Sequence, residues 1–322
     1  MVGEQLQCDD MQNRGELAIV FRQVQHFSVF TGLHVGIDIS KHIKVATAGA
    51  DFLQKQVLKF GDFAYKGVEA TEQEFMPIVQ RLNTKLMDAK IELKVLELED
   101  ITQGIEARTL DFVATNPTQF LQARYRFEVT GALATLVRNH PVTPLTSLAG
   151  VILVRADNSS INSLTDLKER SVAAPGPEFM GGFRAQAYEL HLAGVPTSAL
   201  RLSHVGSHKA VVEAVVAGEV AAGFVRDGFL EGMAKQGKLD LNQIKIINGQ
   251  YRPDFPHLIS TRLHPEWPVF ALPHVSDAPK RQVTAAMLAL DLSAHQLMPH
   301  SVQGFTVPVN RLVKISGASA VL

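Results

Sequence analysis

Residues 203–228, with the sequence SHVGSHKAVVEAVVAGEVAAGFVRDG, contain the clearest succession of structural elements in this 322-residue chain. The pattern predicts a strand, a polar turn, an amphipathic helix, a second strand and another polar turn. Ser207 and His208 stand at the predicted helix start, where free backbone N–H groups and the positive dipole end attract anions. Arg226 ends the second strand. Both turns therefore carry groups suited to holding an anion.

A second stretch upstream repeats this order. Residues 105–117, IEARTLDFVATNP, predict the end of a helix, an acidic residue, a strand and a polar turn. Two such units in separate parts of the chain predict two α/β lobes that face each other across a ligand cleft.

The rest of the chain from residue 57 onwards alternates in the same way. Strands are predicted at 57–64, 91–98, 112–115 and 171–174, with helical patterns between them. Thr71 and Glu74 have the spacing of a helix capping box. Short connections between alternating strands and helices predict a largely parallel sheet with both faces covered.

Composition excludes several classes of protein. The chain is 46% hydrophobic and 20% charged with a net charge of −1, which is ordinary for a globular protein and argues against a general nucleic-acid binder. The single cysteine, Cys8, excludes an intramolecular disulfide framework. No apolar run approaches the length of a membrane span.

Motifs of catalysis and of metal binding are missing from the sequence. It contains no HExxH, no GxSxG and no GxxxxGK[ST] segment. His204 and His208 have helical i, i+4 spacing, but His204 falls on the predicted strand, so the two do not share a helical face. We therefore expect a binding protein and not an enzyme, with no cofactor and no metal.

Six segments, in order, resemble the periplasmic phosphonate-binding-protein family: FAYKGVEAT, DFVATNP, GVILVRAD, SLTDLKERSVAAPGPEFMGG, GSHKAVVEAVVAGEVAAGFVRDG and FPHLISTRLHPEWP. The resemblance covers roughly residues 57–308, and the sequence is most similar to the sensor domains of histidine kinases, including tetrathionate-sensor-like kinases. It implies a type II periplasmic-binding-protein fold, in which two α/β lobes are joined by two crossing strands with a ligand cleft between them. The crossings would fall near residues 151–157 and 248–257.

The family order also implies a division of the chain into lobes. We expect residues 57–152 with 255–310 to form one lobe and residues 155–252 to form the other. Residues 1–56 have poor periodicity and lack the order of a secretion signal, so we interpret them as a peripheral or weakly ordered N-terminal extension. Sequence upstream of the true start and a small extra module are the alternatives. Residues 311–322 are expected to form a C-terminal tail.

The resemblance implies ten ligand-binding positions: Tyr65, Lys66, Thr115, Asn116, Gln119, Phe179, Gly181, Gly182, His208 and Arg226. The loop before Gly181 departs from the family, because residues 177–180 read PEFM where serine or threonine hydroxyls often bind phosphonate oxygens. Each position also has a structural alternative. Asn116 would only start a turn, the glycines would only permit a tight turn, His208 would cap a helix, and Arg226 would pair with a surface carboxylate.

The function implied by the resemblance is binding without catalysis. The chain would be a periplasmic sensor domain that captures a small anion in the cleft and signals by lobe closure to a histidine kinase region. The alternative is the substrate-binding protein of a phosphonate- or phosphate-type ABC transporter, with a permease as its partner. Tetrathionate, another sulfur oxyanion, a phosphonate and a larger organic acid all remain candidate ligands.

Overall fold

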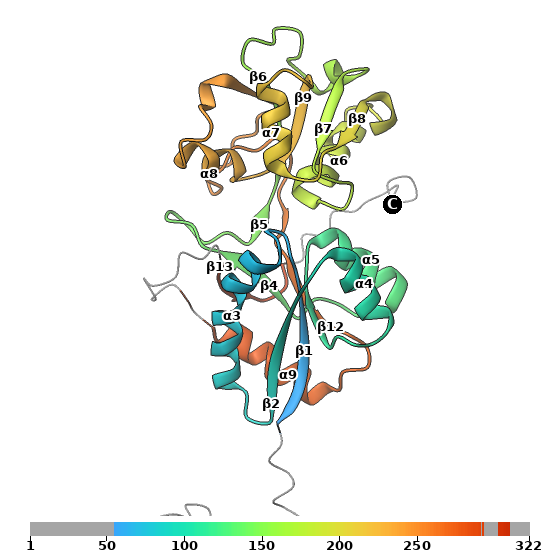
Figure 1. Cartoon of the computed structure of the whole chain (residues 1–322), viewed down its shortest axis with the longest axis vertical. Helices are drawn as coiled ribbons and strands as arrows, with labels where there is room; N and C mark the ends of the chain where they lie inside the picture. The colour runs from blue at the N-terminus through green and yellow to red at the C-terminus, as the bar shows by residue number, and fades with distance from the viewer. Residues whose placement is uncertain (1–54, 291, 293–301, 310–322) are drawn as a thin grey trace, which may run out of the picture. The chain divides into compact units, whose positions relative to one another are not determined.

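The computed structural model describes residues 55–290, 292 and 302–309 (Figure 1). The predicted N-terminal extension, apart from residues 55 and 56, and the predicted C-terminal tail lie outside the described residues. The described part contains two large sheets, each built from segments that are separated in the sequence.

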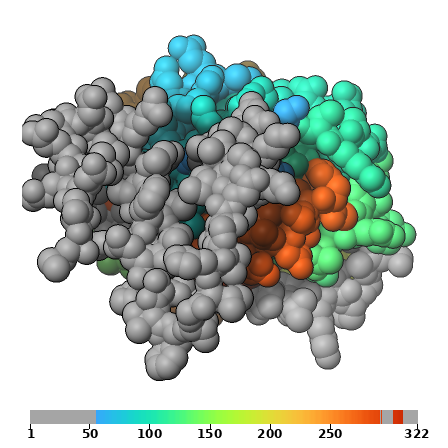
Figure 2. Space-filling model, turned by 90° about the horizontal axis from the view of Figure 1, so that it is seen from below, coloured from blue at the N-terminus to red at the C-terminus, as the bar shows by residue number. Residues whose placement is uncertain are grey.

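The first sheet has six strands in the order β13-β4-β12-β3-β1-β2. Its strands are β1 (Gln56–Phe63), β2 (Ala89–Leu96), β3 (Phe112–Ala114), β4 (Ala134–Arg138), β12 (Pro268–Ala271) and β13 (Val302–Thr306). β1 is parallel to β2 and β3, whereas β12 and β13 pair with their neighbours in antiparallel fashion. Its helices are α3 (Val68–Lys85), α4 (Leu98–Glu106), α5 (Pro117–Phe127) and α9 (Asp277–Leu288). Figure 2 shows the consequence of this order, since the orange segment from the end of the chain lies against the green segments from its first half.

Two helix starts in this lobe have different local causes. α5 begins as its sequence predicts, with Pro117 in the first turn and the Asn116 side chain accepting a hydrogen bond from the Gln119 N–H at 3.1 Å. α3 begins at Val68, after Gly67 has turned the chain with a φ of 85°. The predicted capping box at Thr71 and Glu74 is therefore wrong, because both residues already lie inside the helix.

The second sheet has five strands in the order β10-β6-β9-β7-β8. Its strands are β6 (Gly150–Arg155), β7 (Ser171–Ala174), β8 (Arg201–His204), β9 (Ala222–Arg226) and β10 (Ile244–Ile247), and its helices are α6 (Ala185–Leu192), α7 (His208–Val216) and α8 (Phe229–Lys235). The stretch that opened the sequence analysis becomes β8, α7 and β9. An added Cβ at Gly223 of β9 would stand 2.6 Å from Val211 of α7, so the small residues of this strand let the helix pack directly onto the sheet.

Each sheet has its own hydrophobic core. The six-stranded sheet buries a cluster that includes Phe112, Phe270 and Leu58. The five-stranded sheet buries two clusters, one around Phe224 and the other around Val211. Separate cores are what two lobes of this size require.

Two short strands connect the lobes. β5 (Ser147–Leu148) pairs in antiparallel fashion with β11 (His264–Pro265), and Figure 1 shows β5 between the two large sheets. The crossings predicted at residues 151–157 and 248–257 are wrong in position. The continuous apolar run of β6 is buried inside the five-stranded sheet, so the chain changes lobe before it, at β5, and returns at β11. The exact division of the chain into lobes remains a proposal, supported by the strands of the two sheets.

Candidate functional site

A cavity of about 330 Å³ is lined by residues from both lobes. Phe63 and Tyr65 come from the end of β1 and its turn, and Trp267 precedes β12. His208 starts α7, and Arg226 ends β9 in the other lobe. The cavity thus lies where strands end and helices begin, as in other open α/β sheets.

The structure brings most of the predicted positions to this cavity. Eight of the ten line it: Tyr65, Lys66, Asn116, Phe179, Gly181, Gly182, His208 and Arg226. Their role in binding a ligand stays a prediction.

Thr115 and Gln119 do not line the cavity. Both are buried, and the Thr115 hydroxyl donates to the Gln119 side-chain oxygen. The Gln119 amide donates in turn to the Leu98 carbonyl at 2.7 Å, which ties α5 to the start of α4. Tyr125, which the family order places farther along the same helix, is 86% exposed. These contacts give Thr115 and Gln119 a structural role, and their part in ligand binding stays a prediction.

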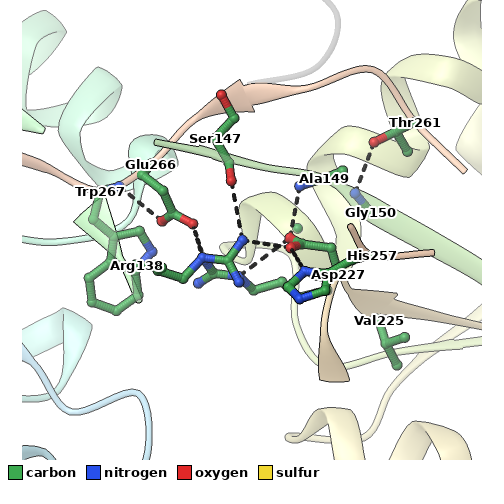
Figure 3. A network of polar contacts seen from close by, with 12 residues as sticks. Arg138, Ser147, Ala149, Gly150, Val225, Asp227, His257, Thr261, Glu266 and Trp267 are labelled. Carbon is green, nitrogen blue, oxygen red and sulfur yellow. Dashed lines mark hydrogen bonds and ion pairs between the residues drawn. The ribbon is translucent and has the colours of Figure 1, made fainter. Parts of the chain in front are cut away.

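A network of ion pairs crosses between the lobes at one side of the cavity (Figure 3). The Arg138 Nη2 donates to the Asp227 Oδ2 at 2.6 Å, and its Nε donates to Glu266. Arg226 donates to the same Glu266 oxygen. Arg138 lies on β4 of the six-stranded sheet, whereas Arg226 ends β9 of the five-stranded sheet and Asp227 follows it. These contacts therefore join one lobe to the other.

Asp227 is the buried centre of this network. Its Oδ1 accepts from the Ala149 N–H at 2.9 Å, and the His257 Nδ1 lies 2.9 Å from its Oδ2 (Figure 3). Burial by itself would raise the pKa of this carboxyl, but the Arg138 guanidinium and the hydrogen bond with His257 hold it well below its usual range. Burial by itself would lower the pKa of Arg138, but the negative charges of Glu266 and then Asp227 outweigh this effect and raise it. The pair therefore stays ionised.

Sequence reasoning missed four members of this site: Arg138, Asp227 as a network centre, His257 and Glu266. Glu266 stands inside the HPEWP segment that carries the family resemblance, and Arg138 directly follows the apolar residues Leu136 and Val137. Those positions were the available signals. Their partners, however, lie far away in the sequence, and the contacts appear only in the fold.

His208 is neutral at neutral pH. Burial, followed by the positive charge of Arg226, lowers the pKa of its imidazole to about 4. The Nδ1 atom is buried and has no hydrogen-bond partner in the described part of the chain. The ring contacts Phe179 at 5.6 Å and Phe229 at 5.3 Å between centroids. His208 therefore offers the cavity a neutral polar atom and an aromatic face.

The turn with Tyr65 and Lys66 is held against α3 by Glu74. The Tyr65 hydroxyl donates to the Glu74 Oε2 at 2.7 Å, and the Lys66 Nζ donates to the same oxygen at 2.9 Å. Asp62 of β1 is completely buried nearby, and burial, followed by the charge of Glu74, raises its pKa well above the ordinary value. The hydrogen bonds to Glu74 therefore hold this turn in place against α3.

Gly181 and Gly182 permit a close approach of cavity residues. An added Cβ at Gly182 would stand 2.5 Å from Pro175 and 2.6 Å from the His208 ring. At Gly181 it would stand 2.9 Å from the Arg226 side chain and 3.0 Å from the Ala149 carbonyl oxygen. The glycines therefore let His208 and Arg226 pack onto this loop, which is a structural need in addition to any contact with a ligand.

Binding is the chemistry that this arrangement supports. The described residues contain no group of three His, Cys, Asp or Glu side chains placed to hold a metal ion. In the same described part of the chain, no helix combines the length and apolarity needed to cross a membrane. The cavity offers cations, an amide and aromatic walls, which bind and orient an anion.

A cavity between two α/β lobes that are joined by two crossing strands defines a ligand-binding protein of the type II periplasmic-binding-protein fold. Residues 60–309 match the family model described as "ABC transporter, phosphonate, periplasmic substrate-binding protein". The chain belongs to this family.

One similar protein is the tetrathionate sensor histidine kinase TtrS of Salmonella typhimurium, which is 28% identical over 229 residues. The alignment covers 70% of this chain but 38% of that protein, so the chain spans less than half of that relative's length.

Solved structures agree on the fold. PhnD1 of Prochlorococcus marinus, in complex with methylphosphonate, has a TM-score of 0.58 and 17% identity, with 79% of this chain and 93% of that chain covered. A protein of Xanthomonas citri bound to ATP has a TM-score of 0.64 and 15% identity, with 80% and 92% covered.

Proposed function

We propose that this chain is a sensor domain that captures a small anion in the cavity between its lobes and signals by lobe closure to a histidine kinase region. The observation that carries the proposal is the cavity itself, which combines Arg138 and Lys66 of one lobe with Arg226 and His208 of the other. The similarity to TtrS favours the sensor role. The family description supports the alternative, a substrate-binding protein that delivers its ligand to an ABC permease.

Lobe closure follows from where the polar groups lie. A ligand that contacts Asn116 and Lys66 on one side and His208 and Arg226 on the other gains all four contacts only when the lobes are close together. A ligand shifts a conformational equilibrium only by its difference in affinity for the two states. The contacts on both sides provide that difference.

The ligand class of the proposal is a sulfur or phosphorus oxyanion or an organic acid. Tetrathionate is named for the relative TtrS, and methylphosphonate and ATP are bound in the neighbouring structures. The loop before Gly181 lacks the hydroxyl donors that suit a phosphonate, and its Glu178 does not line the cavity. We propose a periplasmic location, as the family and the sensor relative suggest, and no catalytic activity.

Thermal unfolding of the purified full chain tests binding directly. Tetrathionate, thiosulfate, methylphosphonate, sulfate and an organic acid, benzoate, are added separately. A ligand at a hundredfold excess over its dissociation constant stabilises the native state by about 2.7 kcal/mol. At least one anion should raise the melting temperature. A panel in which no anion does so contradicts the proposal.

A pair of arginine variants locates the binding. Arg226→Ala should weaken binding of the best anion by about 1.5–3 kcal/mol, because a hydrogen bond from a charged donor is lost. The control is Arg201→Ala, an exposed arginine on β8 that does not line the cavity. Equal affinity for both variants would place the binding site elsewhere.

The genes beside the coding sequence separate the two roles. The sensor role expects a kinase region in the same gene or an adjacent kinase and response regulator. Neighbouring permease and ATPase genes, without a kinase, would favour the transport role.

A further inference from the structure

Aromatic rings form a continuous part of the cavity wall. Six rings from both lobes line it and contact each other in an unbroken series: Tyr65, Trp267, Phe63, Phe179, His208 and Phe229. Centroid distances along the series run from 4.9 Å between the first two rings to 6.3 Å between Phe63 and Phe179, where the series passes from one lobe to the other. A compact anion alone would leave most of these ring surfaces without a partner.

The charges around the cavity nearly cancel. Arg138, Arg226 and Lys66 line it together with the carboxylates Asp227 and Glu266. Both arginines already donate to Glu266, and Arg138 also donates to Asp227. Lys66 donates to Glu74 as well, so these three cations already face three carboxylates, and each negative charge of a ligand has to compete with one of them. A dianion would add a second charge to a confined site without a cation to match it.

Few buried polar atoms of the described residues that line the cavity lack a hydrogen-bond partner. Asn116 and His208 line the cavity, and the Asn116 Nδ2 and the His208 Nδ1 are buried with no hydrogen-bond partner in the described part of the chain. No serine or threonine is among the described residues that line it. Sulfate and phosphate, with four free oxygens, need more donors than a sulfonate with three or a carboxylate with two. One such acid group needs about as many donors as these residues offer.

We infer that the cavity selects an anion with a single negative charge and a flat or polarisable apolar body, such as an aromatic sulfonate or carboxylate, over compact tetrahedral oxyanions. The acid group lies near Arg226, Asn116 and His208, and the body lies between Phe179, Phe229 and the rings of the other lobe. This inference rests on the proposed function, since it names the ligand class of the same cavity. It also explains why phenylalanine and methionine stand in the loop where hydroxyl residues would bind phosphonate oxygens.

Isothermal titration of the full chain with matched probes tests the inference. Benzenesulfonate and methanesulfonate share one acid group and differ only in the body, and burial of a phenyl ring should make the first bind about 10- to 100-fold tighter. Sulfate and phosphate, which are compact dianions, should bind more weakly than benzenesulfonate. Phenyltrimethylammonium carries the same ring with a positive charge and should also bind more weakly.

Leucine variants connect the preference to the rings. Phe179→Leu and Phe229→Leu should each reduce the benzenesulfonate-to-methanesulfonate affinity ratio several-fold, because they weaken benzenesulfonate binding more than methanesulfonate binding. The control is Phe120→Leu on α5, because that ring packs against Phe270 and does not line the cavity. Melting temperatures of all three variants verify that they fold.

Each outcome decides one of the two proposals. Methanesulfonate, sulfate or phosphate binding as tightly as benzenesulfonate overturns the inference and leaves anion binding intact. A ratio that survives both cavity variants, or equal binding of phenyltrimethylammonium, also overturns it. If no anion binds at all, the proposed function itself fails.

Discussion

Replacing Asp227 by asparagine should lower the free energy of unfolding by about 3–5 kcal/mol, the cost of breaking a buried ion pair from one side. The side chain is completely buried and accepts from Arg138 and from the Ala149 N–H, with His257 at 2.9 Å. Asparagine retains the shape and one acceptor oxygen, so the Ala149 contact survives. The buried Arg138 loses one of its two carboxylate partners.

A second substitution separates the two contributions to the loss of unfolding free energy, the lost hydrogen bonds and the unpaired charge of Arg138. Each hydrogen bond to a charged partner contributes about 1.5–3 kcal/mol, and Asp227→Asn weakens two of them, those with Arg138 and His257. In the double variant with Arg138→Met the unpaired cation is removed as well. The double variant should therefore cost less than the sum of the single variants, with a coupling energy of at least about 1.5 kcal/mol.

The protein carries its own probe for this measurement. Trp267 is the only tryptophan in the sequence, is buried and lies beside the network, so its fluorescence follows urea unfolding at the site. The matched control is Asp157→Asn, because Asp157 also pairs with an arginine, Arg155, but at the exposed surface. That variant should unfold at the urea concentration of the parent. An Asp227→Asn midpoint equal to that of the control would refute the reasoning.

The pH dependence gives a second check on Asp227. Its folded pKa is lowered, so the stabilisation is present above the unfolded pKa of about 3.9 and is lost as the pH falls through the folded pKa. The difference in unfolding free energy between parent and Asp227→Asn should be constant from about pH 5 to 7 and should shrink below about pH 4. A difference that does not change with pH would mean that packing, and not charge, causes the effect.

Three further predictions concern other residues of the same lobes. The pKa of His208 is about 4 without ligand, and a bound anion beside the ring would raise it. Sulfonate affinity should therefore rise as the pH falls towards 4 and level off below it. Binding titrations across this pH range measure the effect, and the His208→Gln variant should give a flat profile. Gly182→Ala should destabilise the protein by about 1–3 kcal/mol in urea unfolding, because its Cβ would stand 2.5 Å from Pro175, and an unchanged midpoint would contradict the close packing. Asp62→Asn should stabilise the protein near pH 7 and lose this advantage near pH 4. The raised pKa of Asp62 in the folded protein lowers the free energy of unfolding near pH 7, by about 1.4 kcal/mol for each unit of pKa shift. Equal unfolding curves of parent and variant at pH 7 would contradict this.

The sequence predicted those features that depend on neighbouring residues. Residues 203–228 fold as β8, α7 and β9, because the alternation, the Ser207 cap and the small residues of β9 act over a few positions. The Ser207 hydroxyl accepts from the Ala210 N–H at 3.2 Å, as a helix cap should. The family resemblance then predicted the fold, because local patterns alone could not distinguish between α/β architectures.

The structure departs from the sequence predictions, or adds contacts to them, where distant segments meet. Residues 150–155 have the apolar pattern of any buried strand, and only their pairing with β9 and β10 shows that they belong inside a sheet and do not cross between lobes. Thr115 and Gln119 follow a strand end, as binding residues do, yet the Gln119 side chain turns towards the Leu98 carbonyl. Arg138 and Glu266 are 128 positions apart, and no local pattern links them.

The interlobe network also bears on how the site discriminates between ligands. Arg138 and Arg226 are held by Asp227 and Glu266 before any ligand arrives, so an incoming anion competes for donors that already have partners. Charge alone therefore gives a ligand little net gain, since each new ion pair weakens an existing one. The aromatic walls meet no such competition, because burying apolar surface is favourable wherever water is removed. We therefore expect the carboxylates to oppose binding of small inorganic anions and the rings to decide which organic anion drives the lobes together.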